Sequence, residues 1–419
     1  MTPVLTMDLD DIQTADFELW KLPREEREGA FAALRAERPV AWQKELDDRF
    51  FPLGPGFWAI TKHADIEYIS QNPEIFCSGK GATSIADIPP ELNEVFGNLI
   101  NVDDPRHKHL RGLISAGFTP GRLKKVEEPV RRAAAKIVDR MIEKGEGDFV
   151  ADIASPFPIQ VICDLLGIPE SQHKFVYDNT NKILGAGDPD YIAEGDNMVA
   201  ELFGAGIALQ DLMKEMREER LKNPTDDLTS ILVHAKIDGE GLTEQELASF
   251  FVLLVVAGNE TTRTALAQGM LALSENPKQR AIWQNDFEKV APTAVEEIVR
   301  WTSPVIFMRR TATCDTELRG QAIKEGDKLI LWYNSGNRDE EVFDNPFDFD
   351  VLRTPNDHVG FGGPGPHFCL GANLARREIT VMFREIFERM PDMEVCGEPK
   401  YLLSNFINGI KKLPVKWSV

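Results

Sequence analysis

The residue with the clearest chemical potential in this chain is Cys369, which lies in the segment 361–371, FGGPGPHFCLG. Four glycines and two prolines in this short segment exclude a regular helix or the interior of a strand. The next segment, 372–390, has apolar residues at the spacing of an amphipathic helix. Cys369 is therefore expected where a glycine-rich loop leads into the N-terminus of a helix.

A cysteine at that position is suited to bind a metal as a thiolate. Free backbone N–H groups and the positive end of the helix dipole stabilise the anionic sulfur. Gly363, Gly365 and Gly371 leave room for a large flat group near the backbone. His367 is placed to hydrogen-bond an anionic group at the edge of that object. An axial thiolate on haem iron needs this arrangement, whereas the alternative, a free cysteine in the core, does not need so many glycines.

The second candidate is an acid and a hydroxyl within an apolar helix. The segment 243–246 has a capping-box pattern, and the helix that it starts is expected to run to about Ser274. Gly258 and the adjacent threonines predict a kink or a local widening in its apolar middle. There, Glu260 and Thr261 can relay protons through water to a bound oxygen species. The alternative is structural: the threonines bond the local backbone and Glu260 forms a salt bridge.

Two further pairs have the spacing of one helix face. Glu297 and Arg300 lie in the segment 292–301, a predicted short helix with proline at its first turn. Arg353 is a candidate third member of a buried charge network with Glu297 and Arg300. The alternative is an ordinary surface pair, because E-x-x-R pairs are common on solvated helices. His107 and Arg111 are placed to clamp a carboxylate, the alternative being an exposed basic helix face.

Composition limits the remaining possibilities. The 419 residues contain no linker, repeat or shift in composition, so one domain, 1–419, is expected. Five scattered cysteines without C-x-x-C spacing, and an N-terminus without an apolar core, favour a cytoplasmic protein. The longest apolar run, 250–257, is too short to cross a bilayer. A net charge of −21 argues against nucleic acid or anionic membrane as a partner.

Taken together, these residues resemble the cytochrome P450 family of haem-thiolate monooxygenases. The cysteine loop, AGNETT at 257–262, E-x-x-R at 297–300, the 103–118 segment and Arg353 follow the order and spacing of that family over nearly the whole chain. The resemblance implies a mainly α fold, a helical triangular prism with a small β-rich lobe. It also implies haem b as the cofactor, with Cys369 as the axial ligand of its iron.

The resemblance assigns the other site residues by motif. Glu260 and Thr261 would deliver protons, and Glu297, Arg300 and Arg353 would brace the haem-binding loop. The haem contacts that it implies are His107, Arg111, Arg310 and His367 at the propionates, with Gly363 and Gly371 in the loop. One departure is that the family's aromatic usually lies seven residues before the cysteine, whereas Phe361 lies eight before it and Gly362 occupies the usual slot.

The electrons have to come from another protein. The chain has neither a G-x-G-x-x-G motif after a strand nor clustered cysteines for an iron–sulfur centre. The resemblance therefore implies O2 as co-substrate and a ferredoxin with its reductase as partners. Lys108, Arg376 and Arg377 are candidates for the docking surface, the alternative being an ordinary solvated surface.

The segments 358–379 and 402–417 look like those of bacterial members that oxidise methyl-branched lipids and sterol side chains, which implies hydroxylation of a terminal methyl. Apolar residues suggest a dry, elongated pocket, the alternative being plain core. The candidates are Ile85, Ile88, Leu99, Leu253, Ala257, Val305, Phe307, Phe406 and Ile407. The alternatives are a terpenoid or aromatic substrate, a peroxide-driven member, which would be expected to lack the acid–alcohol pair, and a non-catalytic haem-based gas or redox sensor.

Elsewhere, the residue pattern predicts a helix-dominated chain with few strands. The expected helices span 24–37, 64–72, 171–184 and 191–222. The expected strands lie at 39–41, at 57–61 and within 319–334. Two connections are expected to be functional or mobile: the long loop 77–100 and the corner 185–190 between two helices.

Overall fold

The computed structural model describes residues 2–46, 53–88, 99–118, 120–184, 188, 190–191 and 198–419. Its helices are α1 (Phe17–Lys21), α2 (Arg24–Glu37), α3 (His63–Gln71), α5 (Arg106–Ser115), α6 (Pro120–Met141), α7 (Pro156–Leu166), α8 (Glu170–Leu184), α9 (Met198–Lys222), α10 (Leu228–His234), α11 (Glu244–Glu275), α12 (Pro277–Asn285), α13 (Phe287–Thr302), α14 (Tyr333–Gly336) and α15 (Ala372–Arg389). Shorter turns are the 3-10 helices η1 (Leu9–Asp11) and η2 (Ala116–Phe118) and the π-helical η3 (Val150–Ala154).

The strands form small sheets beside the helices. A five-stranded sheet has the order β1-β2-β8-β5-β3, in which β2 and β8 are parallel and the other pairs antiparallel. Its strands are β1 (Val40–Gln43), β2 (Phe57–Ile60), β3 (Phe76–Cys77), β5 (Phe307–Ala312) and β8 (Lys328–Trp332). The remaining strands are β4 (Glu146–Asp148), β6 (Thr316–Leu318), β7 (Gln321–Ile323), β9 (Glu394–Val395), β10 (Lys400–Tyr401), β11 (Ile410–Lys412) and β12 (Pro414–Lys416).

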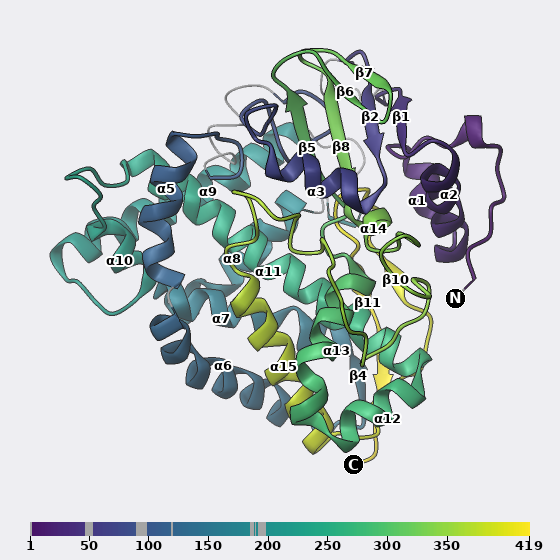
Figure 1. The fold of residues 1–419 in the computed structure, drawn as a ribbon. Coiled ribbons are helices and arrows are strands. Elements are labelled where there is room, and N and C mark those ends of the chain that lie inside the picture. Colours follow the sequence, from purple (N-terminus) through teal and green to yellow (C-terminus); the bar gives the residue numbers. More distant parts are fainter. Residues whose placement is uncertain are drawn as a thin grey trace.

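The helix α11 runs through the middle of the helical body and contacts α7, α8, α9, α13 and α15 (Figure 1). Its N-terminus has the predicted capping box, because Glu246 N–H donates to Thr243 Oγ1 at 3.2 Å and Thr243 N–H donates to Glu246 Oε2 at 2.9 Å. Most of its side chains are buried, as expected for a helix that is apolar nearly all round. The central helix therefore forms the axis of the fold.

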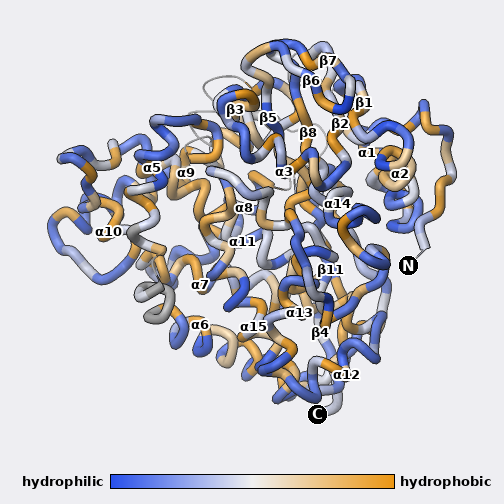
Figure 2. The backbone as a smooth tube through the Cα atoms, viewed as in Figure 1, coloured by the Kyte–Doolittle hydropathy of each residue, from blue (hydrophilic) through white to orange (hydrophobic). Residues whose placement is uncertain are grey.

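A glycine lets two functional helices approach this axis. A Cβ at Gly269 would lie 3.2 Å from Ile298 of α13 and 3.3 Å from Phe383 of α15. Ile298, Phe383 and many neighbours belong to one buried apolar cluster. Apolar residues follow the inward sides of these helices and hydrophilic residues the outer side of α6 (Figure 2). The helix that carries Glu297 and the helix that follows Cys369 are thus packed on α11.

The structure confirms most of the predicted elements and corrects others. The expected helix 24–37 is α2, and the expected strands at 39–41 and 57–61 are present as β1 and β2. The predicted short helix 292–301 is wrong in its start: α13 begins at Phe287 and includes Pro292 in its interior. The fold tolerates the lost N–H there because much of α13 is buried against its neighbours. Near Gly258, where the sequence predicts a kink or a local widening, α11 is α-helical without a π-helical turn, and the kink stays a prediction.

Two predicted connections are described only in part. Residues 89–98 of the loop 77–100, and residues 185–187 and 189 of the corner 185–190, lie outside the described residues. Of the helix predicted over 191–222, the structure describes α9, Met198–Lys222, whereas residues 192–197 lie outside the described residues. No single helix of the described chain has the length and apolar character to span a bilayer, although Val150–Leu166 and Glu170–Leu184, bent by 120°, pass that test as a pair.

Candidate functional site

The loop before α15 is held by backbone hydrogen bonds around Cys369. Cys369 N–H donates to Phe361 O at 2.9 Å, which closes the segment on itself. The helix α15 begins at Ala372, and Ala375 N–H donates to Gly371 O at 2.9 Å in its first turn. Cys369 therefore lies at the entrance to this helix, as the glycine-rich pattern predicts.

The glycines in this loop serve the packing of the loop against α3. A Cβ at Gly363 would lie 2.7 Å from Ser70 Oγ, and one at Gly365 would lie 2.2 Å from Ser70 O. The sequence predicts that both glycines admit a flat ligand to the backbone, but the close neighbour is a helix. Only Gly371 opens toward the sulfur, because a Cβ there would lie 4.0 Å from Cys369 Sγ.

The shifted aromatic has a backbone explanation. Gly362, which occupies the usual aromatic slot, has φ +86°, a conformation that a phenylalanine would adopt only with strain. Phe361 instead packs on the apolar cluster of α11, α13 and α15, with the Arg376 guanidinium 4.5 Å from its ring centre. Its ring lies 6.4 Å from that of Phe368, next to the cysteine. The aromatic thus stays beside the cysteine loop despite the one-residue shift.

The surroundings of the sulfur favour and oppose the thiolate at once. Cys369 is an exposed residue, yet the protein atoms packed around its sulfur desolvate it and raise the pKa of its thiol, while the backbone N–H groups of Gly371 and Ala372 and the charges of Arg111 and Arg376 lower this pKa. The net pKa is above that of a free cysteine, so the helix end that the sequence analysis relied on is outweighed by desolvation. A metal cation facing the sulfur replaces its proton outright. The site therefore suits a metal-bound thiolate better than a free one.

Positive and protonatable groups converge beside this loop. The rings of His107 on α5 and His367 lie 4.2 Å apart. The pKa of His367 is lowered to about 2 by burial and by the charges of Arg310, His107 and Arg111. Arg111 also donates to Phe368 O at 2.6 Å. The structure thus brings together all four residues that the resemblance assigns to the propionates.

This cluster fits the anionic edge of a haem. His107 Nε2 is buried and has no hydrogen-bond partner. Burial lowers the pKa of Arg310, a guanidinium that is 5% exposed and whose Nη1 donates to Arg309 O at 2.7 Å. Unpartnered donors and repelling cations are costly unless an anion lies among them. A haem held through Cys369 supplies two carboxylates, and His107, Arg111, Arg310 and His367 would hold them.

The predicted charge network is present on the opposite side of the loop. Arg300 donates to both oxygens of Glu297 at 2.7 Å, and Arg353 Nε donates to Glu297 Oε2 at 3.1 Å. Arg300 Nη1 also donates to Asn337 O at 2.8 Å and to Pro346 O at 2.9 Å. Glu297 and Arg300 are completely buried. This network ties α13 to the segment between α14 and the cysteine loop.

One stripe of α11 is not buried, although most residues of the helix are. Leu253 and Thr261 are partly exposed and Ala257 is exposed, at positions four residues apart on one face. Thr261 Oγ1 donates to Ala257 O at 2.7 Å, so its lone pairs remain free to accept a hydrogen bond. A hydroxyl between apolar side chains on an open face is placed to contact both a bound oxygen species and an apolar substrate.

Glu260 lies next to this stripe but is turned into the core. Its side chain is 1% exposed and forms an ion pair with Arg263, which the sequence analysis did not single out. Arg263 Nη1 donates to Asn181 Oδ1 of α8 at 2.9 Å. The structural alternative therefore describes the hydrogen bonds that are present: a backbone bond for Thr261 and a salt bridge for Glu260. The sequence contained a signal for this ion pair: Arg263 is a single arginine in an apolar helix, and a buried charge needs an oppositely charged partner.

The predicted substrate residues separate into two groups. Leu253, Ala257, Ile88, Val305 and Phe406 are at least partly exposed and can face a substrate. Ile85, Leu99, Phe307 and Ile407 are buried, at 9%, 6%, 2% and 2% exposure, and their contact with a substrate stays a prediction. Phe307 packs between Trp332 and Phe406, with ring centres 5.2 and 5.3 Å away.

The candidate docking arginines are engaged in ion pairs. Arg376 binds Glu296 through Nε at 2.5 Å and Nη2 at 2.9 Å, and Arg377 Nη1 lies 3.0 Å from Glu127 Oε2. Lys108 is exposed on α5. The two arginines therefore also hold α15 against α13 and α6.

A second buried carboxyl group lies between α11 and α15. Glu378 is 2% exposed, it hydrogen-bonds Thr262, and its Oε2 has no hydrogen-bond partner. Burial raises the pKa of Glu378 to about 8, and the bond with Thr262 opposes this rise only in part. Glu378 is therefore a neutral acid at pH 7. The sequence contained a signal for this buried acid, because Glu378 lies four residues from Leu374 and four from Met382, which are both buried on the same helix face.

This carboxyl group predicts a pH dependence of stability. Between about pH 4.5 and about pH 8 the folded protein keeps a proton that the unfolded chain releases, so stability falls as pH rises through this window. We expect Glu378→Gln to remove this contribution and to melt at a higher temperature than wild type at about pH 9. Melting curves of the holoenzyme from about pH 5 to about pH 9 measure it. Glu388→Gln, exposed on the same helix, is the control, and identical slopes for all three proteins would contradict the prediction.

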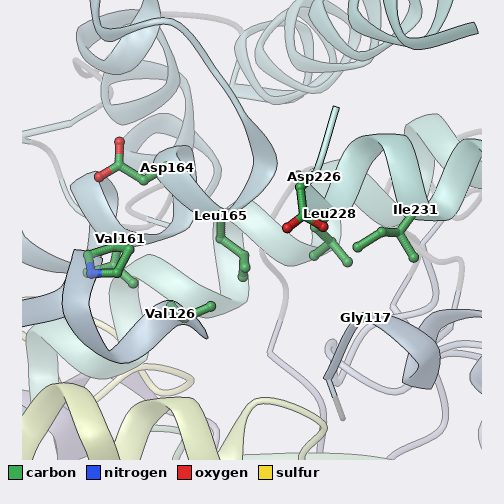
Figure 3. Close-up of a pocket in the computed structure, with 9 residues that line it drawn as sticks. Gly117, Val126, Val161, Asp164, Leu165, Asp226, Leu228 and Ile231 are labelled. Carbon is green, nitrogen blue, oxygen red and sulfur yellow. The ribbon is translucent and has the colours of Figure 1, made fainter. Parts of the chain in front are cut away.

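A cavity of about 210 Å3 is lined by residues outside the cysteine loop (Figure 3). It lies among α6, α7, α10 and η2 and is lined by Gly117, Val126, Pro129, Val161, Asp164, Leu165, Asp226, Leu228 and Ile231. None of these residues belongs to the site around Cys369. The cavity therefore has no part in the chemistry described above.

Comparison with known proteins extends the motif-based resemblance. The family model for cytochrome P450 matches residues 205–398. The chain is 49% identical over 420 aligned residues to a methyl-branched lipid omega-hydroxylase of Mycobacterium tuberculosis, covering all of this chain and 97% of that protein. It is 39% identical to a steroid C26-monooxygenase of Mycolicibacterium smegmatis, covering all of this chain and 95% of that protein.

Among solved structures, the chain is similar to a cytochrome P450 of Mycobacterium marinum in complex with pseudoionone. The TM-score is 0.92 and the identity 41%, with complete coverage of both chains. Full-length identity, this fold and the cysteine loop with its cluster of cations all agree. The chain belongs to the cytochrome P450 family and is a haem-thiolate monooxygenase.

Proposed function

We propose that this protein hydroxylates the terminal methyl group of a methyl-branched lipid or of a sterol side chain. The observation that carries the proposal is the 49% identity, over the full chain, to a methyl-branched lipid omega-hydroxylase. The steroid C26-monooxygenase at 39% identity supports the same end-of-chain chemistry. The apolar open stripe of α11 is consistent with a long apolar substrate.

Three residues, Cys369, Thr261 and Glu260, would serve the oxygen chemistry. Cys369 holds the haem, which, once bound, supplies oxygen activation through electron donation from the thiolate. Thr261 would accept a hydrogen bond from a water molecule at the open face of α11, because its own proton is donated to Ala257 O. Glu260 supplies the proton behind it, as a general acid–base group.

The remaining task is to present the correct carbon atom. A primary C–H bond is stronger than the secondary bonds beside it, so selectivity for the terminal methyl requires that the pocket orient the chain. Leu253 and Ala257 on α11, with Ile88, Val305 and Phe406, supply apolar contacts for this purpose. The whole chain, 1–419, would act as one domain.

The electron donor in this proposal is a ferredoxin with its reductase. The chain carries no flavin-binding or iron–sulfur motif, so both electrons have to cross a protein interface. Lys108 on α5, next to the propionate residues, is exposed and available for an acidic partner. Arg376 and Arg377 would contribute only by exchanging their present carboxylate partners.

Regiochemistry tests the proposal. The holoenzyme is reconstituted with a ferredoxin and its reductase and supplied with an iso-branched fatty acid, its straight-chain isomer or a 3-keto sterol. We expect a saturable shift to high spin and a primary alcohol at the branch as the main product. Mainly subterminal alcohols, or turnover of none of these lipids, would overturn the assignment.

A second candidate is oxidation of a terpenoid. It is favoured by the 41% identical relative, whose structure contains pseudoionone. The same assay decides between the two, because pseudoionone is included as a fourth compound. A larger kcat/KM for pseudoionone than for the branched lipid would replace the first proposal by the second.

A further inference from the structure

The buried ion pair of α11 is connected to α8 rather than isolated. Glu260 and Arg263 are 1% and 4% exposed in their side chains and lie one helical turn apart. Arg263 reaches Asn181 Oδ1 at 2.9 Å, and Asn259 Nδ2 donates to Thr180 Oγ1 at 3.3 Å. Two adjacent residues of α8 therefore contact two residues of α11 that flank the acid.

Only one of the two carboxylate oxygens of Glu260 has a hydrogen-bond partner. Arg263 Nη2 bonds Glu260 Oε1, whereas the buried Glu260 Oε2 has no hydrogen-bond partner. A buried carboxylate oxygen without a donor is costly, and water is its natural partner. The direction of this free oxygen is therefore set by the bond that Arg263 makes to the other one.

The position of the Arg263 guanidinium depends on the side chains that it contacts. It is a long, flexible side chain, and Glu260, Asn181 and Tyr191 are its contacts. Asn181 belongs to α8, and Tyr191 belongs to the connection that follows it. If α8 moves away from α11, Arg263 loses its Asn181 bond, and the carboxylate loses its fixed orientation.

We propose that Arg263 is a positioning residue for Glu260, and that its bond to Asn181 makes proton delivery depend on the placement of α8 against α11. This inference rests on the proposed role of Glu260 in proton delivery. It adds that the relay is ordered only while α8 lies in the position described here. Proton delivery is then expected to be less efficient when α8 is displaced from α11.

Coupling of electrons to product tests the proposal. We expect Arg263→Met to lower kcat by about tenfold or more and to divert reducing equivalents to hydrogen peroxide, as the loss of a placed proton donor does. Arg263→Lys keeps the charge near Glu260 and should recover part of the coupling. Asn181→Ala should show the same defect at a smaller size, with a changed solvent isotope effect on kcat. The substrate dissociation constant, measured by the spin shift, should stay within about twofold of wild type, since the altered step follows binding.

A matched control lies on the same helix. Asn179 of α8 is partly exposed and bonds Phe175 O of its own helix, so Asn179→Ala should leave coupling unchanged. Amide hydrogen exchange provides a readout that does not depend on turnover: residues 170–184 should exchange faster in Asn181→Ala than in Asn179→Ala.

The outcomes separate this inference from the proposed function. If Glu260→Gln impairs coupling but Arg263→Met and Asn181→Ala do not, Arg263 is not a positioning residue, and the relay role of Glu260 stands. If Glu260→Gln leaves coupling intact, the relay itself is refuted, and this inference with it. A loss of haem binding in Arg263→Met that Arg263→Lys does not reverse, with normal coupling in Asn181→Ala, would assign the ion pair to stability alone.

Discussion

Replacing Cys369 by serine is expected to abolish monooxygenase activity and to remove the red-shifted Soret band of the reduced carbon-monoxide complex. The Cys369 sulfur is the group of the loop that would hold the haem iron, and a hydroxyl does not donate electrons as a thiolate does. The chain should still fold, because the cluster beneath α15 lacks this side chain. His107, Arg111, Arg310 and His367 should continue to hold the propionates.

The measurement is a pair of spectra with a haem count. Haem content should remain substantial in Cys369→Ser, while the carbon-monoxide difference band moves away from that of the wild type. Cys314→Ser is the control, because Cys314 is a free and exposed cysteine outside the site. A variant that retained the wild-type carbon-monoxide spectrum would contradict the assignment of Cys369 as ligand.

The second large effect is expected for the buried network of α13. Glu297→Gln removes a carboxylate that binds Arg300 and Arg353 and that also accepts from Asp350 N–H at 2.9 Å. Leaving the Arg300 guanidinium buried without its counter-charge costs about 3–5 kcal/mol, a large part of the stability of a typical domain. We expect low yield, little bound haem and a strongly lowered melting temperature.

Two further variants define the cause. Arg300→Lys keeps the charge but loses the planar fork that serves Glu297 and the backbone oxygens of Asn337 and Pro346, so it should be almost as damaging. Lys174→Gln is the control, since it breaks an exposed pair with Asp178 one turn away on α8 and should change stability by only about 0–1 kcal/mol. Equal effects of Glu297→Gln and Lys174→Gln would refute the bracing role.

The network explains why residues far from the iron are needed at the site. Arg300 bonds backbone oxygens between α14 and the cysteine loop, and Asn356 Nδ2 donates to Glu297 Oε2 at 3.1 Å just before that loop. Glu296, next along α13, binds His358 and Arg376 on either side of Phe361. Together these bonds fix both ends of the loop. The position of the sulfur thus depends on charges that never contact the haem.

The sequence by itself determined the elements whose signals are local. The cysteine loop, the capping box at Thr243, the face shared by Glu297 and Arg300, and the pairing of His107 with Arg111 depend on spacings of a few residues. Such spacings fix helix faces and loop conformations before any tertiary contact forms. The fold class and the haem-thiolate chemistry were predictable because these local motifs together resemble the cytochrome P450 family.

Only the tertiary structure decided which residues meet across the chain. Asn181 contacts Arg263 from 82 positions away, and Ser70, not a ligand, is what Gly363 and Gly365 approach. Burial of Phe307 and Ile407, but not of Val305, likewise depends on how strands and loops pack. Desolvation, which raises the pKa of Cys369 above the value that the helix end alone would give, is a property of the folded surroundings. Contacts between residues that are far apart in the sequence leave no local pattern. The sequence therefore predicted the chemistry, whereas the tertiary structure determined which neighbours hold each group.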